Sequence, residues 1–233
     1  MRILITRPLE DARDTAQRLI GLGHEAVIAP LLDIHFREGP TIALDGIQAI
    51  AATSANGVRA IARRTLRRDV PIFAVGPQTT EAARAEGFLR IRDADGDAEN
   101  LAAAIPTWAS PDKGAVLHAA GSAAPKALAA KLENAGFIVR RESLYEARAV
   151  DHLPENATRA LRENMLDAVM LFSPHSAQIL VRLLSKAELT DACSRLIAFC
   201  ISRATADAIA SLEFCDIRVA ARPNQEALFR LLA

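Results

Sequence analysis

Short polar turns recur between apolar segments and amphipathic segments of the sequence. They combine Gly, Ser, Thr or Asn with the start of a potential helix, at Thr6-Arg7-Pro8, Thr53-Ser54-Ala55-Asn56, Gly76-Pro77-Gln78-Thr79, Gly121-Ser122, Ser173-Pro174-His175-Ser176 and Ser202-Arg203-Ala204-Thr205. The free N–H groups and partial positive charge of a helix N-terminus suit carboxylates or phosphates. The same side chains also serve as simple helix caps. The turns therefore predict either a set of capped helices or several binding points for a polyanionic ligand.

The single tyrosine, Tyr145, is the other candidate for chemistry. It lies in a long extended run, 137–150, where strand alternation would place Leu144 and Tyr145 on opposite faces. A lone tyrosine most often packs in a core with its hydroxyl at the rim. The alternative is a catalytic role, in which the side chain of Tyr145 projects from a crossover strand toward a cleft.

The elements that would position these residues occur twice. "RILITRP" and the helical pattern after it are echoed by "GAVLHAAG" and its helical pattern, so that Leu19 matches Leu132 and Gly23 matches Gly136. Each pattern has apolar residues at i, i+3 and i+4 and ends at a Gly, which favours a left-handed C-terminal cap. Each repeat therefore predicts a strand followed by a helix.

Two further repeats complete the pattern. "AIAATSANGVRAIA" matches "AVMLFSPHSAQILV", and "FAVGPQTTEAARAEGF" matches "FCISRATADAIASLEF". In each half of the chain, one more helical segment follows these repeats. Strands that alternate with helices are typical of parallel sheets covered on both faces. The sequence predicts an α/β protein with two similar doubly wound parallel-sheet domains, whose strands carry the polar turns at their carboxyl ends.

Two long extended runs, 25–38 and 137–150, bear on the domain boundaries. Both exceed the mean strand length of about 5–6 residues, so the chain could cross between domains there as a pair of extended strands. The first domain would then contain residues 1–35 plus 149–233, and the second residues 36–148. Two contiguous halves remain the alternative at this stage.

Composition excludes several classes of protein. Apolar residues make up 51% of the chain, and 28 Lys and Arg balance 28 Asp and Glu, so we expect a folded protein that binds no nucleic acid. Three dispersed cysteines and five scattered histidines show no metal-ligand spacing, and no nucleotide-binding motif is present. The N-terminus resembles no export signal and no apolar run could span a membrane. We therefore expect a cytoplasmic monomer without metal or other cofactor.

Taken together, five segments resemble the uroporphyrinogen-III synthase family. They are "ILITRP...LGHEAVIAPLLDI", "TSANGVRA", "AVGPQTTEAARAEGF", "LENAGFIVRRESLYEAR" and "ATADAI", and they cover nearly the whole chain in order. The resemblance implies two α/β domains joined by a pair of extended strands, with the chain crossing between them. It also implies an enzyme that uses no cofactor. Such an enzyme closes hydroxymethylbilane, a linear tetrapyrrole polycarboxylate, to uroporphyrinogen III with loss of water and inversion of the last pyrrole ring.

The resemblance also assigns residues. Tyr145 matches the family tyrosine that assists departure of the substrate hydroxyl. Substrate contacts are implied for the recurrent arginine and threonine of the family and for the turn positions, which here are Arg7, Thr205, Ser54, Asn56, Gly76, Thr79 and Ser173. A structural salt bridge for Arg7 and a cap for Thr205 remain alternatives.

This chain departs from the family pattern at two places. It has Ser202-Arg203 where the family usually has Gly-Pro, and Ala120 where the family often has Arg. We expect Ser202 and Arg203 to contact substrate, with Arg203 supplying the charge that is missing at Ala120. The alternative function is a non-catalytic two-domain paralogue that binds or senses a small molecule.

Overall fold

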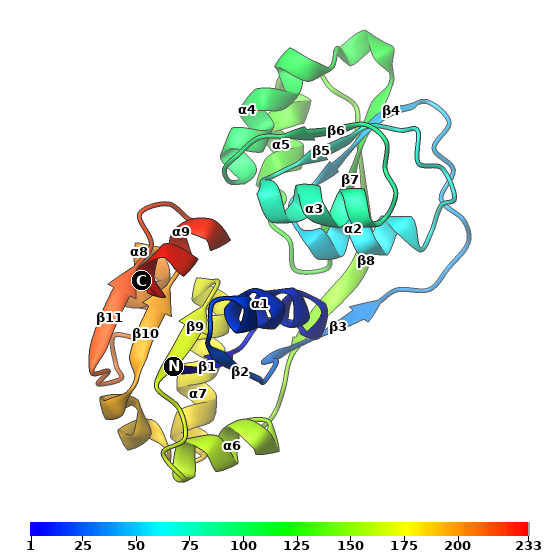
Figure 1. Cartoon of the computed structure of the whole chain (residues 1–233). Coiled ribbons are helices and arrows are strands. Elements are labelled where there is room, and N and C mark those ends of the chain that lie inside the picture. The colour runs from blue at the N-terminus through cyan, green and yellow to red at the C-terminus, as the bar shows by residue number, and fades with distance from the viewer. Residues whose placement is uncertain (233) are drawn as a thin grey trace. The chain divides into compact units, whose positions relative to one another are not determined.

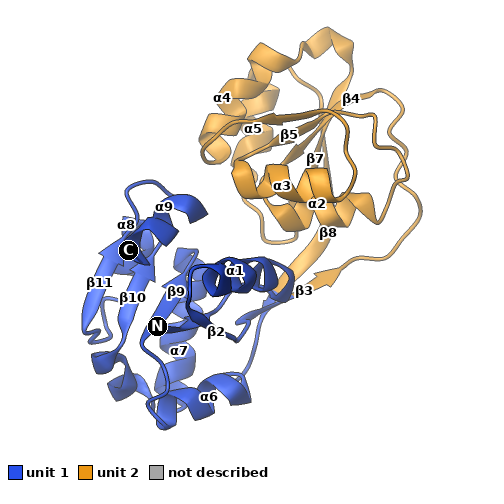
Figure 2. Ribbon diagram, viewed as in Figure 1, with its two compact units in different colours: residues 1–33, 148–233 blue, residues 34–147 orange. Residues whose placement is uncertain are grey.

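The computed structural model describes residues 1–232 and divides into two compact units (Figure 2). Unit 1 contains Met1–Asp33 and the chain from Arg148 onward, and unit 2 contains Ile34–Ala147. The chain leaves unit 1 within β3 (Leu32–Phe36) and returns within β8 (Val139–Ala149). Within residues 1–232, no helix has the length and apolar character that a membrane span requires.

Unit 1 is built on a parallel five-stranded sheet in the order β11-β10-β9-β1-β2. Its strands are β1 (Arg2–Ile5), β2 (Glu25–Ile28), β9 (Ala168–Leu171), β10 (Ile197–Cys200) and β11 (Asp216–Val219). Its helices are α1 (Leu9–Gly21), α6 (Glu155–Arg162), α7 (Pro174–Lys186), α8 (Arg203–Asp207) and α9 (Gln225–Phe229), with 3-10 turns at Thr190–Arg195 and Arg230–Leu232. Ile3 and Ile5 pack with α1 and α9, whereas Leu4 faces α6 and α7, because successive strand residues alternate between the faces.

Unit 2 is built on a six-stranded sheet in the order β3-β8-β7-β4-β5-β6. Besides β3 and β8, its strands are β4 (Ile47–Ala52), β5 (Ile72–Ala74), β6 (Ile91–Asp93) and β7 (Ala115–Gly121). Its helices are α2 (Ala55–Ala62), α3 (Pro77–Ala85), α4 (Ala98–Trp108) and α5 (Ala127–Asn134), with a 3-10 turn at Pro111–Lys113. Helices α2 and α3 cover one face of the sheet, and α4 and α5 cover the other (Figure 1).

The two units repeat one strand order. Strands β11, β10, β9, β1 and β2 of unit 1 correspond to β6, β5, β4, β7 and β8 of unit 2. Matching positions in the two ladders are Met170, Ile5 and Ile28 in unit 1 and Ala51, His118 and Arg141 in unit 2. The prediction of two similar doubly wound α/β domains is confirmed, because each sheet is parallel in its repeated part and carries helices on both faces.

The strands β3 and β8 form the crossover that the sequence predicts. The Arg37 N–H donates to the Leu144 carbonyl, and the Val150 N–H donates to the Leu31 carbonyl, so the two strands run antiparallel. The expectation of one extended run over 25–38 is wrong, because β2 ends at Ile28 and β3 begins at Leu32. Pro30 lies in this interruption, and its missing N–H cannot contribute to a strand ladder.

The repeated helix ends have the expected caps. Gly23 and Gly136 follow α1 and α5 with φ of +81° and +86°, which glycine adopts without steric cost. The N–H groups of the residues after them donate to the carbonyls of Leu19 and Leu132, and both leucine side chains are fully buried. The glycine therefore ends each helix and returns the chain to the sheet.

Candidate active site

Each unit has one place where its strand order reverses. In unit 2 the chain adds β5 and β6 on one side of β4, then places β7 and β8 on the other side. In unit 1 the corresponding neighbours are β9 and β1. Doubly wound sheets bind ligands outside the carboxyl ends of the strands that flank such a reversal. In unit 2 these ends lead to Ser54 and Gly121, and in unit 1 to Ser173 and Arg7.

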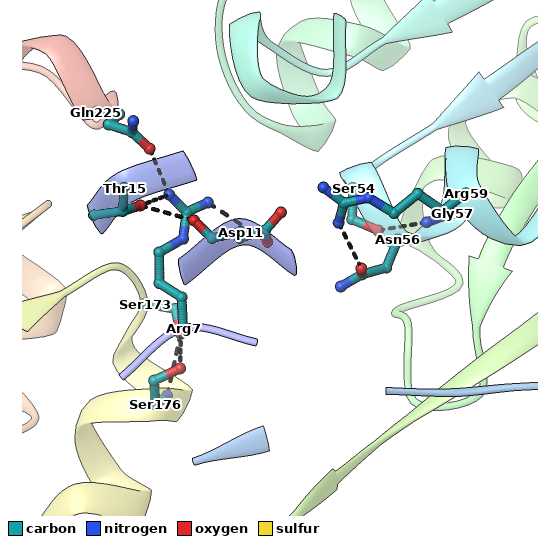
Figure 3. Close-up of polar contacts among 10 residues, drawn as sticks. All are labelled: Arg7, Asp11, Thr15, Ser54, Asn56, Gly57, Arg59, Ser173, Ser176 and Gln225. Carbon is teal, nitrogen blue, oxygen red and sulfur yellow. Dashed lines mark hydrogen bonds and ion pairs between the residues drawn. The ribbon is translucent and has the colours of Figure 1, made fainter. Parts of the chain in front are cut away.

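Tyr145 and Ser54 meet at the reversal in unit 2. Their hydroxyl oxygens lie 2.8 Å apart although the residues are 91 positions apart in the chain. Ser54 is also the N-cap of α2, since its Oγ accepts a 3.1 Å hydrogen bond from the Gly57 N–H (Figure 3). The phenol of Tyr145 is therefore held beside a helix N-terminus, where developing negative charge is stabilised.

A register shift places Tyr145 there. Ala120 pairs with Ser143, but Gly121 pairs with Tyr145, so Leu144 is an extra residue in β8. Bulges in parallel pairs are rare and often re-aim a side chain next to an active site. The expectation that Leu144 and Tyr145 occupy opposite faces is wrong for this reason, because both pack against the core that α2 covers.

Gly121 accommodates the ring of Tyr145. A Cβ at this position would lie 2.9 Å from Cζ and 3.1 Å from the hydroxyl oxygen of Tyr145. Gly57 has a similar role for α2, since a Cβ there would lie 2.5 Å from the Ala119 carbonyl oxygen. Gly121 therefore lets the Tyr145 ring approach the backbone of β7. Gly57 lets α2 approach the Ala119 carbonyl.

Asn56 binds Arg59, a residue that the sequence analysis did not select. Its Oδ1 accepts a 3.0 Å hydrogen bond from Arg59 Nη1, which places the guanidinium at the first turns of α2 near Ser54 (Figure 3). The spacing of three residues from Asn56 to Arg59 within a predicted helix was the available signal, because side chains at i and i+3 are neighbours. A guanidinium there suits a carboxylate ligand.

The second predicted turn of unit 2, at Gly76 and Pro77, leads into α3. Gly76 is the N-cap of α3 and Pro77 is its first residue, while Thr79 is buried in the first turn. Thr80 donates a 2.7 Å hydrogen bond to Asp93 at the end of β6. Gly76 and Thr79 therefore lie at the carboxyl edge of the sheet, two strands from β7.

Strands β7 and β8 also contain buried polar atoms without hydrogen-bond partners. His118 is 1% exposed, and neither of its ring nitrogens has a hydrogen-bond partner. Burial lowers the pKa of His118 to about 4, and the neighbouring Arg141 charge adds to the effect. The Nε of Arg141 and the Oγ of Ser143 are likewise buried without a partner.

Arg7 of unit 1 is directed inward. Its side chain is 5% exposed and lies 3.6 Å from the Asp11 carboxylate, and its Nη1 donates to Thr15 and Gln225 (Figure 3). Its guanidinium also stacks 4.2 Å from the ring centre of Phe172. Arg7 therefore ties α1 to the first residue of α9 at the carboxyl edge of the sheet.

The other predicted residues of unit 1 lie at helix starts. Ser173 caps α7 through the Ser176 N–H and also donates to the Ser176 hydroxyl. Ser202 caps α8 through the N–H of Thr205, whose hydroxyl lies 3.0 Å from Ser202 Oγ.

Arg203 and the cysteines occupy different environments. The Arg203 side chain is 84% exposed and pairs with Asp207 one turn later in α8. Burial raises the pKa of both Cys193 and Cys200 to about 11, so neither thiol is suited to nucleophilic chemistry at neutral pH. Among residues 1–232, no group of His, Cys, Asp or Glu side chains gathers as metal ligands would.

These features define a class of protein. Two doubly wound α/β units of one strand order carry capped helices at their carboxyl edges, and one edge holds a phenol against a helix N-terminus. Such a protein is a duplicated doubly wound α/β protein, a fold class in which ligands bind at the carboxyl edges of the sheets.

Comparisons with known proteins identify the family to which the chain belongs. Residues 13–230 match the family model of uroporphyrinogen-III synthase HemD, and the chain belongs to this family of tetrapyrrole-biosynthesis enzymes. The solved uroporphyrinogen-III synthetase of Helicobacter pylori covers 100% of this chain and 98% of its own at 16% identity, with a TM-score of 0.64. A mutant uroporphyrinogen III synthase of Thermus thermophilus covers 100% and 97% at 16% identity, with a TM-score of 0.53. No curated protein sequence matches the chain.

Proposed function

We propose that this chain converts hydroxymethylbilane to uroporphyrinogen III without a cofactor, with Tyr145 as the general acid. The observation that carries the proposal is the contact between Tyr145 and Ser54, where two hydroxyls meet at the N-terminus of α2. Membership in the family supplies the tetrapyrrole as the substrate class. The contact supplies a proton donor at the place where a doubly wound sheet binds ligands.

The chemistry requires one proton donor. The substrate hydroxyl leaves as water with the Tyr145 proton, and the pyrrole nitrogen stabilises the resulting azafulvene cation. The substituted carbon of the last ring attacks this cation to give a spiro intermediate, which reopens and closes again with the ring inverted. The final closure releases a proton from the pyrrole carbon, which returns to the phenolate. Water is the net loss, and Tyr145 is regenerated.

Ser54 would direct the phenol proton. Its Oγ already accepts from the Gly57 N–H, so its own hydroxyl hydrogen is available for the Tyr145 oxygen. In that arrangement the Tyr145 oxygen accepts from Ser54, so the contact does not use the phenol proton. The Ser54 hydroxyl and the α2 N-terminus then stabilise the phenolate that forms.

The turns would hold the substrate carboxylates. In unit 2 we assign this role to Ser54, Asn56, Gly76 and Thr79, and we add Arg59. In unit 1 we assign it to Ser173, Ser202, Arg203 and Thr205, whose hydroxyls or amides lie at the starts of α7 and α8. Arg7 would shape the same edge of unit 1, because its guanidinium bonds to Thr15 and Gln225. Backbone amides and hydroxyls suit a polyanion in a chain of balanced charge.

We also propose that the protein acts as a monomer in the cytoplasm and binds no nucleic acid. The balance of 28 basic and 28 acidic residues supports the last point, because non-specific nucleic-acid binding requires a basic surface. Three free cysteines are consistent with a reducing compartment. Sedimentation equilibrium with the purified chain would reveal a dimer if one forms.

The isomer composition of the product tests the function. Freshly generated hydroxymethylbilane is mixed with the purified protein in the absence of any cofactor, and the uroporphyrinogen isomers are separated after oxidation. We expect type III to predominate, since the enzyme must enforce attack by the substituted carbon. Type I alone, formed at the rate seen without protein, would instead support the non-catalytic binding or sensor paralogue.

A further inference from the structure

We propose that Arg141 is a positioning residue for Tyr145, acting through the turn that connects β7 to α5. This inference rests on the proposed role of Tyr145 as the acid. Arg141 lies on the same strand as Tyr145, four residues before it, and on the other side of the Leu144 bulge. No sequence motif pointed to Arg141.

Arg141 fixes both ends of the turn. Its Nη2 donates to the Gly121 carbonyl at 3.1 Å and to the Ala124 carbonyl at 3.0 Å. The Ala124 N–H also donates to the Gly121 carbonyl, so the guanidinium closes a turn that is already hydrogen-bonded. A planar guanidinium can bond two carbonyls at once in a fixed geometry.

The turn after β7 contacts both the backbone and the ring of Tyr145. The Ser122 N–H donates to the Tyr145 carbonyl at 2.8 Å. Gly121 lies against the phenol ring so closely that a Cβ would meet Cζ at 2.9 Å. A shift of the Gly121–Ala124 turn would therefore change the space available to the ring and with it the approach of the phenol to Ser54. Small displacements of a catalytic group cost large factors in rate.

Unit 1 shows that the fold does not need this arginine. The ladder positions of His118 and Arg141 are occupied by Ile5 and Ile28 in unit 1. Unit 2 instead buries a histidine without partners beside the arginine, an arrangement that costs desolvation energy. The presence of Arg141 at this position of unit 2, where unit 1 has the apolar Ile28, therefore points to a role beyond packing.

Tyr145 provides a direct readout, because it is the only tyrosine in the sequence. Tyrosine labelled with carbon-13 at Cζ gives one resonance that reports the surroundings of the phenol. We expect Arg141→Gln to shift this resonance or split it into several. Arg141→Lys should restore the wild-type signal in part, since an ammonium can bond one or both carbonyls. The matched control is Arg140→Gln, because Arg140 is exposed and pairs with Glu142.

Kinetics separate positioning from a merely structural role. We expect Arg141→Gln to lower kcat by about tenfold to a hundredfold, with KM changed by less than about threefold because no substrate contact is removed. In a Tyr145→Phe background the same substitution should have little further effect, since the residue it positions no longer donates a proton. An equal loss in both backgrounds would overturn the inference.

Folding and function are controlled separately. Circular dichroism and thermal unfolding of each variant identify those that fold, and Gly121→Ala tests the same contact with Arg141 intact if Arg141→Gln does not fold. The Gly121→Ala variant should also displace the Tyr145 resonance. A wild-type resonance in both Arg141→Gln and Gly121→Ala would reject the inference. If the wild-type protein makes no type III product, the proposed function fails, and the resonance alone decides whether Arg141 positions Tyr145.

Discussion

The two units carry different side chains at equivalent positions of their sheets. Where unit 1 has Ile5 beside Ile28, unit 2 has His118 beside Arg141. Where the α7 cap of unit 1 bonds to Ser176, the α2 cap of unit 2 bonds to Tyr145. The comparison teaches that the repeated strand order fixes where helices start but not what their caps contact.

Arg7 is a difference in the other direction, because here unit 1 has the charged residue and unit 2 has an alanine. In the sequence repeat Arg7 corresponds to Ala120 of unit 2, and its guanidinium bonds to residues of α1 and α9. Unit 1 therefore holds its edge together with the buried Arg7, whereas in unit 2 the partly buried Arg141 bonds to the turn beside Tyr145. Substitutions at these matched positions test whether the two units differ in this way.

The largest effect is expected for Tyr145→Phe. Loss of the proton donor should lower kcat by about 10²- to 10⁴-fold, while the ring keeps its packing against Gly121. Steady-state rates of uroporphyrinogen III formation measure the loss, and circular dichroism checks the fold. A kcat within threefold of wild type would remove Tyr145 from the mechanism and with it the main difference between the units.

Arg7→Ala should have the largest effect on stability. The substitution takes away the guanidinium that faces the buried Asp11 carboxylate and the ring of Phe172. Removing one member of a buried ion pair typically costs about 3–5 kcal/mol. Urea unfolding measures the change, and the Arg7→Ala/Asp11→Ala double variant should lose less than the two single changes added. A loss below about 1 kcal/mol would show that the edge of unit 1 does not depend on Arg7.

His118 should make unit 2 sensitive to acid. Its pKa in the folded state is about 4, below the ordinary 6.5, so the unfolded chain binds more protons between these values. Stability should therefore fall as the pH decreases from about 6.5 to 4, by about 3 kcal/mol from this group. His118→Ile, which copies Ile5 of unit 1, should remove that part of the loss. Urea unfolding at pH 7 and pH 4.5 compares the two proteins, and identical losses would contradict the assignment.

The two serine caps give a matched pair of smaller effects. Ser54→Ala and Ser173→Ala each remove an N-cap, so each should cost about 1 kcal/mol of stability. Only Ser54→Ala also removes the neighbour of the Tyr145 hydroxyl, and we expect it to lower kcat by about tenfold. Any effect of Ser173→Ala on activity should appear in KM. Equal losses of kcat in the two variants would contradict the contrast between the caps.

Arg203→Ala should have the smallest effect on stability. Its exposed ion pair with Asp207 is worth less than about 0.5 kcal/mol. If Arg203 supplies the charge that is missing at Ala120, KM should rise while kcat stays near wild type. An unchanged KM would reject this compensation and leave Arg203 as a solvated residue of α8.

Much of the fold could be predicted from the sequence. The repeats around Leu19 and Leu132 gave the duplication, and the glycines after them gave the helix ends, because apolar spacing and caps are local properties. The hydroxyls of Ser54 and Ser173 predict helix starts for the same reason, and both residues are N-caps in the structure. The break at Pro30 was missed, although the residue itself signals it.

The sequence alone determined the alternation of strands and helices, the repeated order of polar turns and the singular Tyr145. Three features depend on the three-dimensional fold: the phenol contacts Ser54, Leu144 is an extra residue in its strand, and Arg141 closes the turn beside the phenol. Local patterns depend on neighbouring residues and are readable one segment at a time. Contacts across 91 residues depend on the register between distant strands, and a shift of one residue changes which side chains meet.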